Sequence, residues 1–150
     1  MKHQVVLFLL IFSCCSCAKK KAEKQAADDE KVIVKYINDH NLSAKATGSG
    51  LYYVVNTPGT GANPTINSSV TVNYKGYLTT GTVFDESASV GITFGLNGVI
   101  KGWQEGIPYF KKGGKGILLV PSALGYGSQT NGKISANSVL IFDVELLNIK

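Results

Sequence analysis

The chain has 150 residues and a mass of 16.0 kDa, which fits one domain with an extension and excludes a multidomain assembly. With 44% hydrophobic and 17% charged residues, its composition is neither disordered nor fibrous. Fifteen lysines, no arginine and ten acidic residues give a net charge of +5. Because readers of nucleic-acid sequence rely on arginine, we expect no nucleic-acid partner.

The first apolar segment is too short to span a membrane. Val5–Phe12 is an unbroken apolar run, whereas a membrane-spanning helix needs roughly 20 apolar residues. The length of the run is typical of the apolar part of a signal peptide. The alternative, a buried helix of the domain, is disfavoured because the run is apolar on every side.

All three cysteines, Cys14, Cys15 and Cys17, follow this run directly. A disulfide framework would distribute its cysteines along the chain, and a zinc site would need more ligands than His3 and His40 supply. We therefore expect no metal and no cofactor. Cysteines placed behind an apolar run and small residues resemble a bacterial lipoprotein signal, which implies cleavage before a cysteine that carries fatty acyl chains such as palmitate.

Cys14 is the preferred lipid-attachment residue, because Ile11 and Ser13 stand at positions −3 and −1 before it. Cys17, preceded by Ser16, is the alternative. Two or three acyl chains anchor a protein firmly where one would exchange. Residues 1–17 are thus predicted to be a lipoprotein signal peptide and lipid-attachment region, which implies a lipid-anchored membrane protein of the cell envelope that faces the periplasm.

Residues 18–47 are predicted to form a tether and one amphipathic helix. Ala18–Ala27 is polar apart from alanine, which favours a solvated tether over a lysine patch on anionic lipid headgroups. The helix is predicted over residues 29–42, with acidic residues at its start and an apolar stripe that packs on the flank of the domain. The stripe contains Val32, Ile33, Tyr36, Ile37 and His40. His40 is a lone histidine at the edge of this stripe, which favours a capping or packing role over metal binding or catalysis.

Beyond Gly50 the hydrophobic period changes to two, which predicts strands. The expected strands cover residues 51–56, 70–75, 83–85, 92–96, 117–121 and 139–149. A short helix with one apolar side is expected within Gly98–Tyr109, and a long loop over Ser122–Asn137. Many short strands, one central helix and no βαβ rhythm indicate an antiparallel α+β domain.

This strand-rich part lacks the residues for strong acid–base chemistry. It contains no histidine, no cysteine and no phosphate-binding glycine motif. Its acids are Asp85, Glu86, Glu105, Asp143 and Glu145. Either the domain binds other molecules, or its reaction needs no strong acid, base or metal.

Aromatic residues recur in nearly every element after residue 70, and the same part of the chain contains six ordered motifs. The motifs are VxVxYxGxL at 70–78, GxxFD at 81–85, FxLxxVIxGWxEGI at 94–107, KxGxK at 111–115, PxxLxYG at 121–127 and LxFDVELL at 140–147. Through these motifs the chain resembles the FKBP-type peptidyl-prolyl cis-trans isomerases from about Gly50 to Ile149. The resemblance implies a curved antiparallel sheet of five to six strands wrapped around a short helix, here preceded by the N-terminal helix. Residues 48–150 are accordingly assigned to the isomerase domain.

The resemblance also implies an enzyme, a peptidyl-prolyl cis-trans isomerase that accelerates rotation about X-Pro bonds in exported or envelope proteins. It gives Trp103 as the floor beneath the proline ring, the Ile100 N–H and the Tyr126 hydroxyl as donors to substrate carbonyls, and Asp85 as a polarising group. The implied substrate-binding residues are Tyr74, Phe84, Ile92, Val99, Ile134 and Phe142.

Proline-containing peptides or unfolded proteins are the implied partners, and macrolides are possible inhibitors. One short helix is too little for a long dimerisation arm, so we expect a monomer. Two alternatives remain open: a proline-binding chaperone or holdase module with little catalytic turnover, and a purely structural envelope lipoprotein.

Overall fold

The computed structural model describes residues 11–150, with side chains from Cys17 onward. The predicted signal peptide covers residues 1–17, of which residues 1–10 lie outside the described range. The helices are α1 (Ile11–Asp39) and α2 (Lys101–Gly106), with 3₁₀ turns η1 (Leu96–Gly98), η2 (Ile107–Tyr109) and η3 (Ser122–Leu124). The strands are β1 (Lys45–Ala46), β2 (Tyr52–Thr57), β3 (Ser69–Leu78), β4 (Val83–Glu86), β5 (Ile92–Gly95), β6 (Lys115–Val120) and β7 (Leu140–Ile149).

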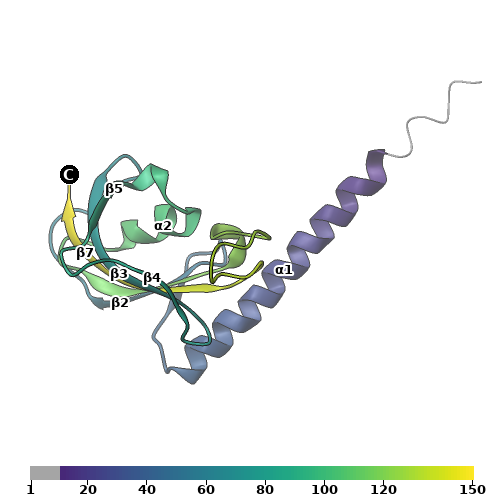
Figure 1. Cartoon of the computed structure of the whole chain (residues 1–150), viewed down its shortest axis with the longest axis horizontal. Coiled ribbons are helices and arrows are strands. Elements are labelled where there is room, and N and C mark those ends of the chain that lie inside the picture. Colours follow the sequence, from purple (N-terminus) through teal and green to yellow (C-terminus); the bar gives the residue numbers. More distant parts are fainter. Residues whose placement is uncertain (1–10) are drawn as a thin grey trace, which may run out of the picture.

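All the strands belong to one antiparallel sheet that curves around α2 (Figure 1). The order is β1-β2-β6-β7-β3-β4, and β5 pairs with β3. The longest pair is β3·β7, which runs from Val70 opposite Ile149 to Leu78 opposite Leu140, with one register shift between Thr71 and Val72. This confirms the α+β class and the curved sheet around a short helix. The sheet has seven strands rather than five or six, and β1, with two residues, is too short to show an alternating pattern.

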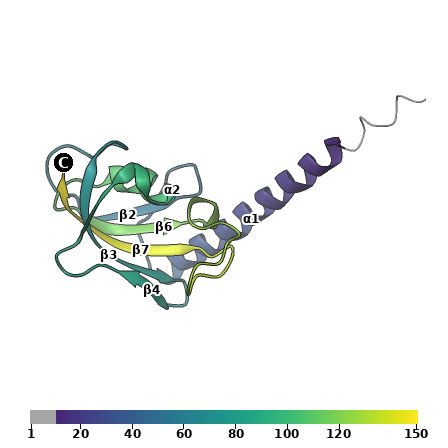
Figure 2. The same ribbon diagram turned by 45° about the horizontal axis from the view of Figure 1, so that its top comes forward.

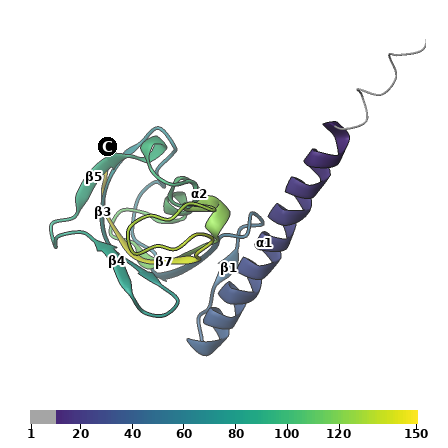
Figure 3. The same ribbon diagram turned by 45° about the vertical axis from the view of Figure 1, so that its right-hand side comes forward.

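The sheet is covered on both faces where β2 and β6 run. Alternate side chains of β6 point to opposite faces: Leu118 and Val120 pack with Trp103 and α2, whereas Leu119 packs with Ile33 of α1. Figures 2 and 3 show α2 inside the curve of the sheet and α1 outside it. Burial on both faces explains why β6 is apolar without alternation.

Helix α1 begins much earlier than predicted. The expected tether, Ala18–Ala27, is helical, although its side chains are largely exposed. Alanine, lysine and glutamate have high helix propensity, and ion pairs four residues apart support the helix farther along. These pairs join Lys24 Nζ to Asp28 Oδ2 at 2.9 Å and Lys35 Nζ to Asp39 Oδ2 at 2.5 Å. The expectation of a monomer was based on a short N-terminal helix. Because α1 is longer than expected, that reason no longer applies, and the monomer stays a prediction.

The second half of α1 packs on the domain, as the apolar stripe predicted. Ile33 is fully buried, and the Tyr52 hydroxyl donates a hydrogen bond to Glu30. The His40 ring stacks on Tyr36 with a centroid distance of 3.8 Å, and its Nδ1 lies 2.9 Å from the Tyr36 carbonyl oxygen, which confirms the packing and capping role. None of the helices in the described range has both the length and the apolar character needed to cross a membrane.

Gly116 in β6 gives a test of how closely the sheet is packed. An added Cβ would overlap the carbonyl oxygen of Val54 on β2 and lie 2.7 Å from Cε1 of Phe110. We expect Gly116→Ala to lower the free energy of unfolding by about 3 kcal/mol, because backbone must move to admit the methyl group. Urea unfolding measures the change. Gly98→Ala is the matched control, since an added Cβ there meets nothing within 4 Å; equal losses in the two variants would contradict the prediction.

Candidate functional site

A hollow of about 380 Å³ opens between α2 and the concave side of the sheet. Its walls are mostly aromatic and aliphatic side chains, contributed by β3, β4, β5, α2 and its preceding turn, the loop after η3, and β7. The lining residues are Tyr74, Phe84, Asp85, Ile92, Phe94, Gly98, Val99, Ile100, Trp103, Tyr126 and Phe142.

Trp103 lies at the base of this hollow, near the start of α2. Ile100 is the N-cap of the helix, and its carbonyl oxygen accepts the N–H of Trp103 at 3.0 Å. The indole is only 5% exposed. Three rings surround it: Tyr74 at 5.0 Å and Phe142 at 5.3 Å in edge-to-face contacts, and Phe94 at 5.5 Å in a tilted contact. The edge-to-face geometry of the first two contacts is favourable for aromatic pairs, so the rings hold one another at the base of the hollow.

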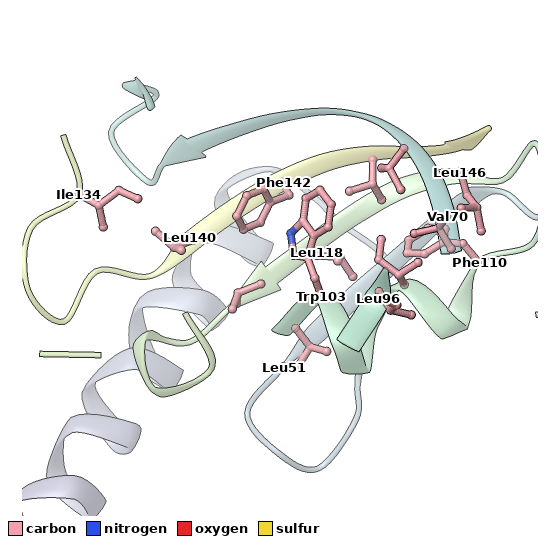
Figure 4. Close-up of a cluster of buried hydrophobic side chains, with 14 residues drawn as sticks. Leu51, Val70, Leu96, Trp103, Phe110, Leu118, Ile134, Leu140, Phe142 and Leu146 are labelled. Atoms are coloured by element: carbon pink, nitrogen blue, oxygen red, sulfur yellow. The ribbon is translucent and has the colours of Figure 1, made fainter. Parts of the chain in front are cut away.

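The indole nitrogen has no hydrogen-bond partner. Among the side chains that the structure describes, Trp103 Nε1 is the buried nitrogen or oxygen that lacks one. Figure 4 shows it on the side of the indole that faces Phe142. Because this N–H is buried, the indole presents mainly its apolar ring atoms to the hollow.

The polar groups of the hollow lie toward its edge. Tyr74 Oη donates a hydrogen bond of 2.6 Å to Asp85 Oδ2, across the neighbouring strands β3 and β4. Burial raises the pKa of the Tyr74 hydroxyl above its ordinary value of 10.0, and the hydrogen bond and negative charge of Asp85 raise that pKa further. At neutral pH, Tyr74 is therefore a protonated donor that holds the exposed Asp85 carboxylate in place.

Tyr126 forms part of the rim and is 36% exposed. Gly125 and Gly127 flank it, and their N–H groups donate to the Ser122 carbonyl oxygen at 3.0 and 2.8 Å. Gly127 has a φ of +59°, which favours glycine. Ile92 also belongs to the rim and is 49% exposed.

The structure brings together every residue predicted for this site except Ile134. That buried side chain is not among the residues that line the hollow, and in Figure 4 it lies beyond Leu140, away from Trp103. Sequence reasoning missed Phe94 and Gly98, which also line the hollow. The signal was present for Phe94, because it opens the motif that contains Trp103.

A second hollow, of about 390 Å³, involves β3, β6 and β7 but has different walls. Its lining is mainly lysine, acidic and amide side chains, and Lys115 Nζ pairs with Glu145 Oε1 at 2.9 Å. It offers no group of aromatic rings to an apolar ligand. The described side chains also include no group of three His, Cys, Asp or Glu placed to hold a metal ion; the absence of a metal stays a prediction. The hollow above Trp103 is therefore the candidate site.

Fold and site together define a small α+β domain with an aromatic pocket for an apolar group. The model of the FKBP-type peptidyl-prolyl cis-trans isomerase family matches residues 61–147. This chain belongs to that family, as its motifs indicated.

Among its relatives is an isomerase named FkpA from Buchnera aphidicola subsp. Schizaphis graminum, 53% identical over 107 residues that cover 69% of this chain and 42% of that protein. The crystal structure of FkpA from Escherichia coli has a TM-score of 0.74 and 41% identity, and covers 95% of this chain and 70% of that one. An isomerase structure from Pseudomonas syringae pv. tomato has a TM-score of 0.75 and 29% identity, and covers 85% of this chain and 95% of that one. The chain thus spans less than half the length of the curated relative from Buchnera.

The Tyr74–Asp85 hydrogen bond predicts a pH dependence of stability. Well below pH 10.0 the Tyr74 hydroxyl is protonated in both folded and unfolded chains, and its contribution is fully present. As the pH rises above that value, the unfolded tyrosine ionises first, so the contribution is lost progressively. We expect the wild-type free energy of unfolding, minus that of Tyr74→Phe, to be constant from about pH 8 to pH 9. This difference should decrease toward about pH 11. Urea unfolding of both proteins checks this, and a constant difference would contradict it.

Proposed function

We propose that this protein is a peptidyl-prolyl cis-trans isomerase that accelerates X-Pro rotation in exported or envelope proteins as a folding catalyst. One observation carries the proposal: Trp103 and its three neighbouring rings form the apolar base of a hollow that is open to solvent. A five-membered proline ring is apolar and compact, so it suits such a base better than a charged or extended group.

The proposed reaction needs only what the hollow contains. Rotation about an X-Pro amide faces a barrier of about 18–20 kcal/mol, which arises from the partial double bond, and no covalent bond is made or broken. Uncatalysed isomerisation takes tens to hundreds of seconds. The planar amide is more dipolar than the twisted one, so apolar walls destabilise the planar form relative to the twisted form. The reaction therefore requires no proton transfer and no metal.

Three polar groups at the edge would orient the substrate and stabilise the twisted amide. The N–H of Ile100, as an N-cap, has no acceptor within α2 and is suited to a substrate carbonyl. The Tyr126 hydroxyl at the rim is suited to a second one. Asp85 supplies a fixed negative charge through its bond to Tyr74. Groups that are held in place before the substrate binds need little reorganisation during the reaction.

We expect Asp85→Asn to lower kcat/KM for a proline peptide about tenfold. Exchange of cis and trans peaks, followed by NMR, measures the rate. The fold offers a matched control, since Tyr77 Oη donates to Asp143 Oδ1 at 3.0 Å and neither residue lines the hollow above Trp103. Asp143→Asn removes a carboxylate from an equivalent tyrosine–aspartate pair and should leave kcat/KM unchanged. Equal effects in the two variants would contradict the site assignment.

A proline-limited refolding assay on the wild type, Asp85→Asn and Asp143→Asn tests the alternative function, a proline-binding holdase. Faster refolding supports the isomerase, whereas protection from aggregation without faster refolding supports the holdase. Macrolides are proposed to occupy the same hollow, so a macrolide should inhibit isomerisation of the peptide by competition.

We also propose a lipid anchor at Cys14, with Cys17 as the alternative, which would hold the protein in the envelope membrane facing the periplasm. The apolar run, the small residues and the clustered cysteines support it. The beginning of α1 extends away from the sheet (Figure 1), so an anchor there would leave the hollow clear of a membrane surface.

Metabolic labelling with palmitate tests the anchor. We expect Cys14→Ser to lose the label and to leave the membrane fraction, and Cys17→Ser, the matched control, to keep both. The reverse result would assign the anchor to Cys17, and an unlabelled wild-type protein would exclude it.

A further inference from the structure

Asp29 is an acidic side chain buried in the middle of α1. It is 2% exposed, and its Oδ1 accepts a hydrogen bond of 2.7 Å from Gln25 Nε2. Its Oδ2 accepts two hydrogen bonds from Ser122, at 2.8 Å from the backbone N–H and at 2.6 Å from the hydroxyl. No ion pair of Asp29 occurs among the described residues. Since a buried carboxylate is costly unless it is hydrogen-bonded, Asp29 strongly favours one position of Ser122.

Ser122 in turn controls the backbone around Tyr126. Its carbonyl oxygen accepts the N–H groups of both Gly125 and Gly127, which flank the tyrosine. Ser122 is itself 2% exposed and opens the turn η3, so its N–H has no acceptor within that turn. Asp29 supplies the missing acceptor from another part of the chain.

The loop needs such support because its own sequence restricts it little. Glycine populates many backbone conformations, and a tyrosine between two glycines is therefore poorly fixed by local preference. Residues 122 and 126 are joined by a single 3₁₀ turn, so a shift of the first moves the second. The Tyr126 side chain lines the hollow above Trp103.

We propose that Asp29 is a positioning residue for Tyr126: through Ser122, helix α1 holds the tyrosine at the rim where it meets the substrate. The proposal rests on the proposed isomerase function and adds to it a contribution from an element outside the sheet. Asp29 touches no substrate, and its effect passes through two hydrogen bonds to one residue.

The chain offers a matched control next to Asp29. Asp28 is also on α1, but it is partly exposed and pairs with Lys24 and Lys31 at the surface. Asp28→Ala removes the same chemical group one residue away, without touching Ser122, and should leave both the loop and the activity unchanged.

The first measurement is kcat/KM for a proline peptide, well below the unfolding temperature of each variant. We expect Asp29→Ala to lower it about tenfold, and Asp29→Asn, which keeps an oxygen acceptor of the same shape, to retain most of it. In a Tyr126→Phe background the Asp29→Ala effect should shrink to less than twofold, because the hydroxyl to be positioned is gone. A loss equal in both backgrounds, or none in Asp29→Ala, would overturn the proposal.

The second measurement does not depend on activity. We expect amide hydrogen exchange at Gly125 and Gly127 to become at least tenfold faster in Asp29→Ala and to stay unchanged in Asp28→Ala. If Asp29→Ala does not fold, Ser122→Ala replaces it, and about threefold faster exchange is expected, since only the hydroxyl donor is lost.

Unchanged exchange overturns the inference even if the wild type is active. An inactive wild type with the expected change in exchange overturns the proposed function and leaves the positioning of Tyr126 by Asp29 supported.

Discussion

The close contact between α2 and β6 determines the shape of the site. Side-chain atoms of Val120 fill the space where a Cβ of Gly102 would lie, and Leu118 Cδ2 would be 2.7 Å from a Cβ of Gly106. With glycine at both positions, the short helix lies directly on the sheet, although glycine lowers helix propensity. Helix α2 therefore depends on this packing, because six residues are too few to form a stable helix alone. The contact places Trp103, the neighbour of Gly102, within the curve of the sheet.

The position of Trp103 separates the apolar and polar parts of the hollow. The indole fills the base together with Phe94 and Phe142, and the hydrogen-bonding groups of Tyr74 and Asp85 lie toward the edge. A ligand with a compact apolar ring and flanking carbonyl groups would match this arrangement, with its ring on the apolar base and its carbonyl groups at the polar edge. This match supports the proposed rotation about an imide bond, a reaction in which binding and orientation would replace acid–base chemistry.

The sequence predicted the elements whose pattern is local and missed those that depend on distant partners. Leu140, Phe142, Val144 and Leu146 alternate along β7 and share the core, as their spacing indicated. The ordered motifs located the pocket because all its lining residues except Ile92 lie within them. The first half of α1 was missed because it has no apolar pattern, although its alanine-rich and charged composition favours a helix. Ile134 was assigned to the pocket by resemblance alone, and in this chain it does not line the hollow.

Asp29 shows most clearly what sequence spacing leaves out. Beside Asp28 and Glu30 it suggested negative charge at a helix start, yet α1 begins at Ile11 and the carboxylate is buried. Its partner, Ser122, lies 93 residues away, and nothing local to either residue indicates the contact. The contact also gives α1 a reason to pack where it does: Ile33 supplies apolar contact with β6, whereas Asp29 fixes which loop the helix meets. Apolar packing alone tolerates small shifts of a helix along a sheet, but two hydrogen bonds to one serine define its position.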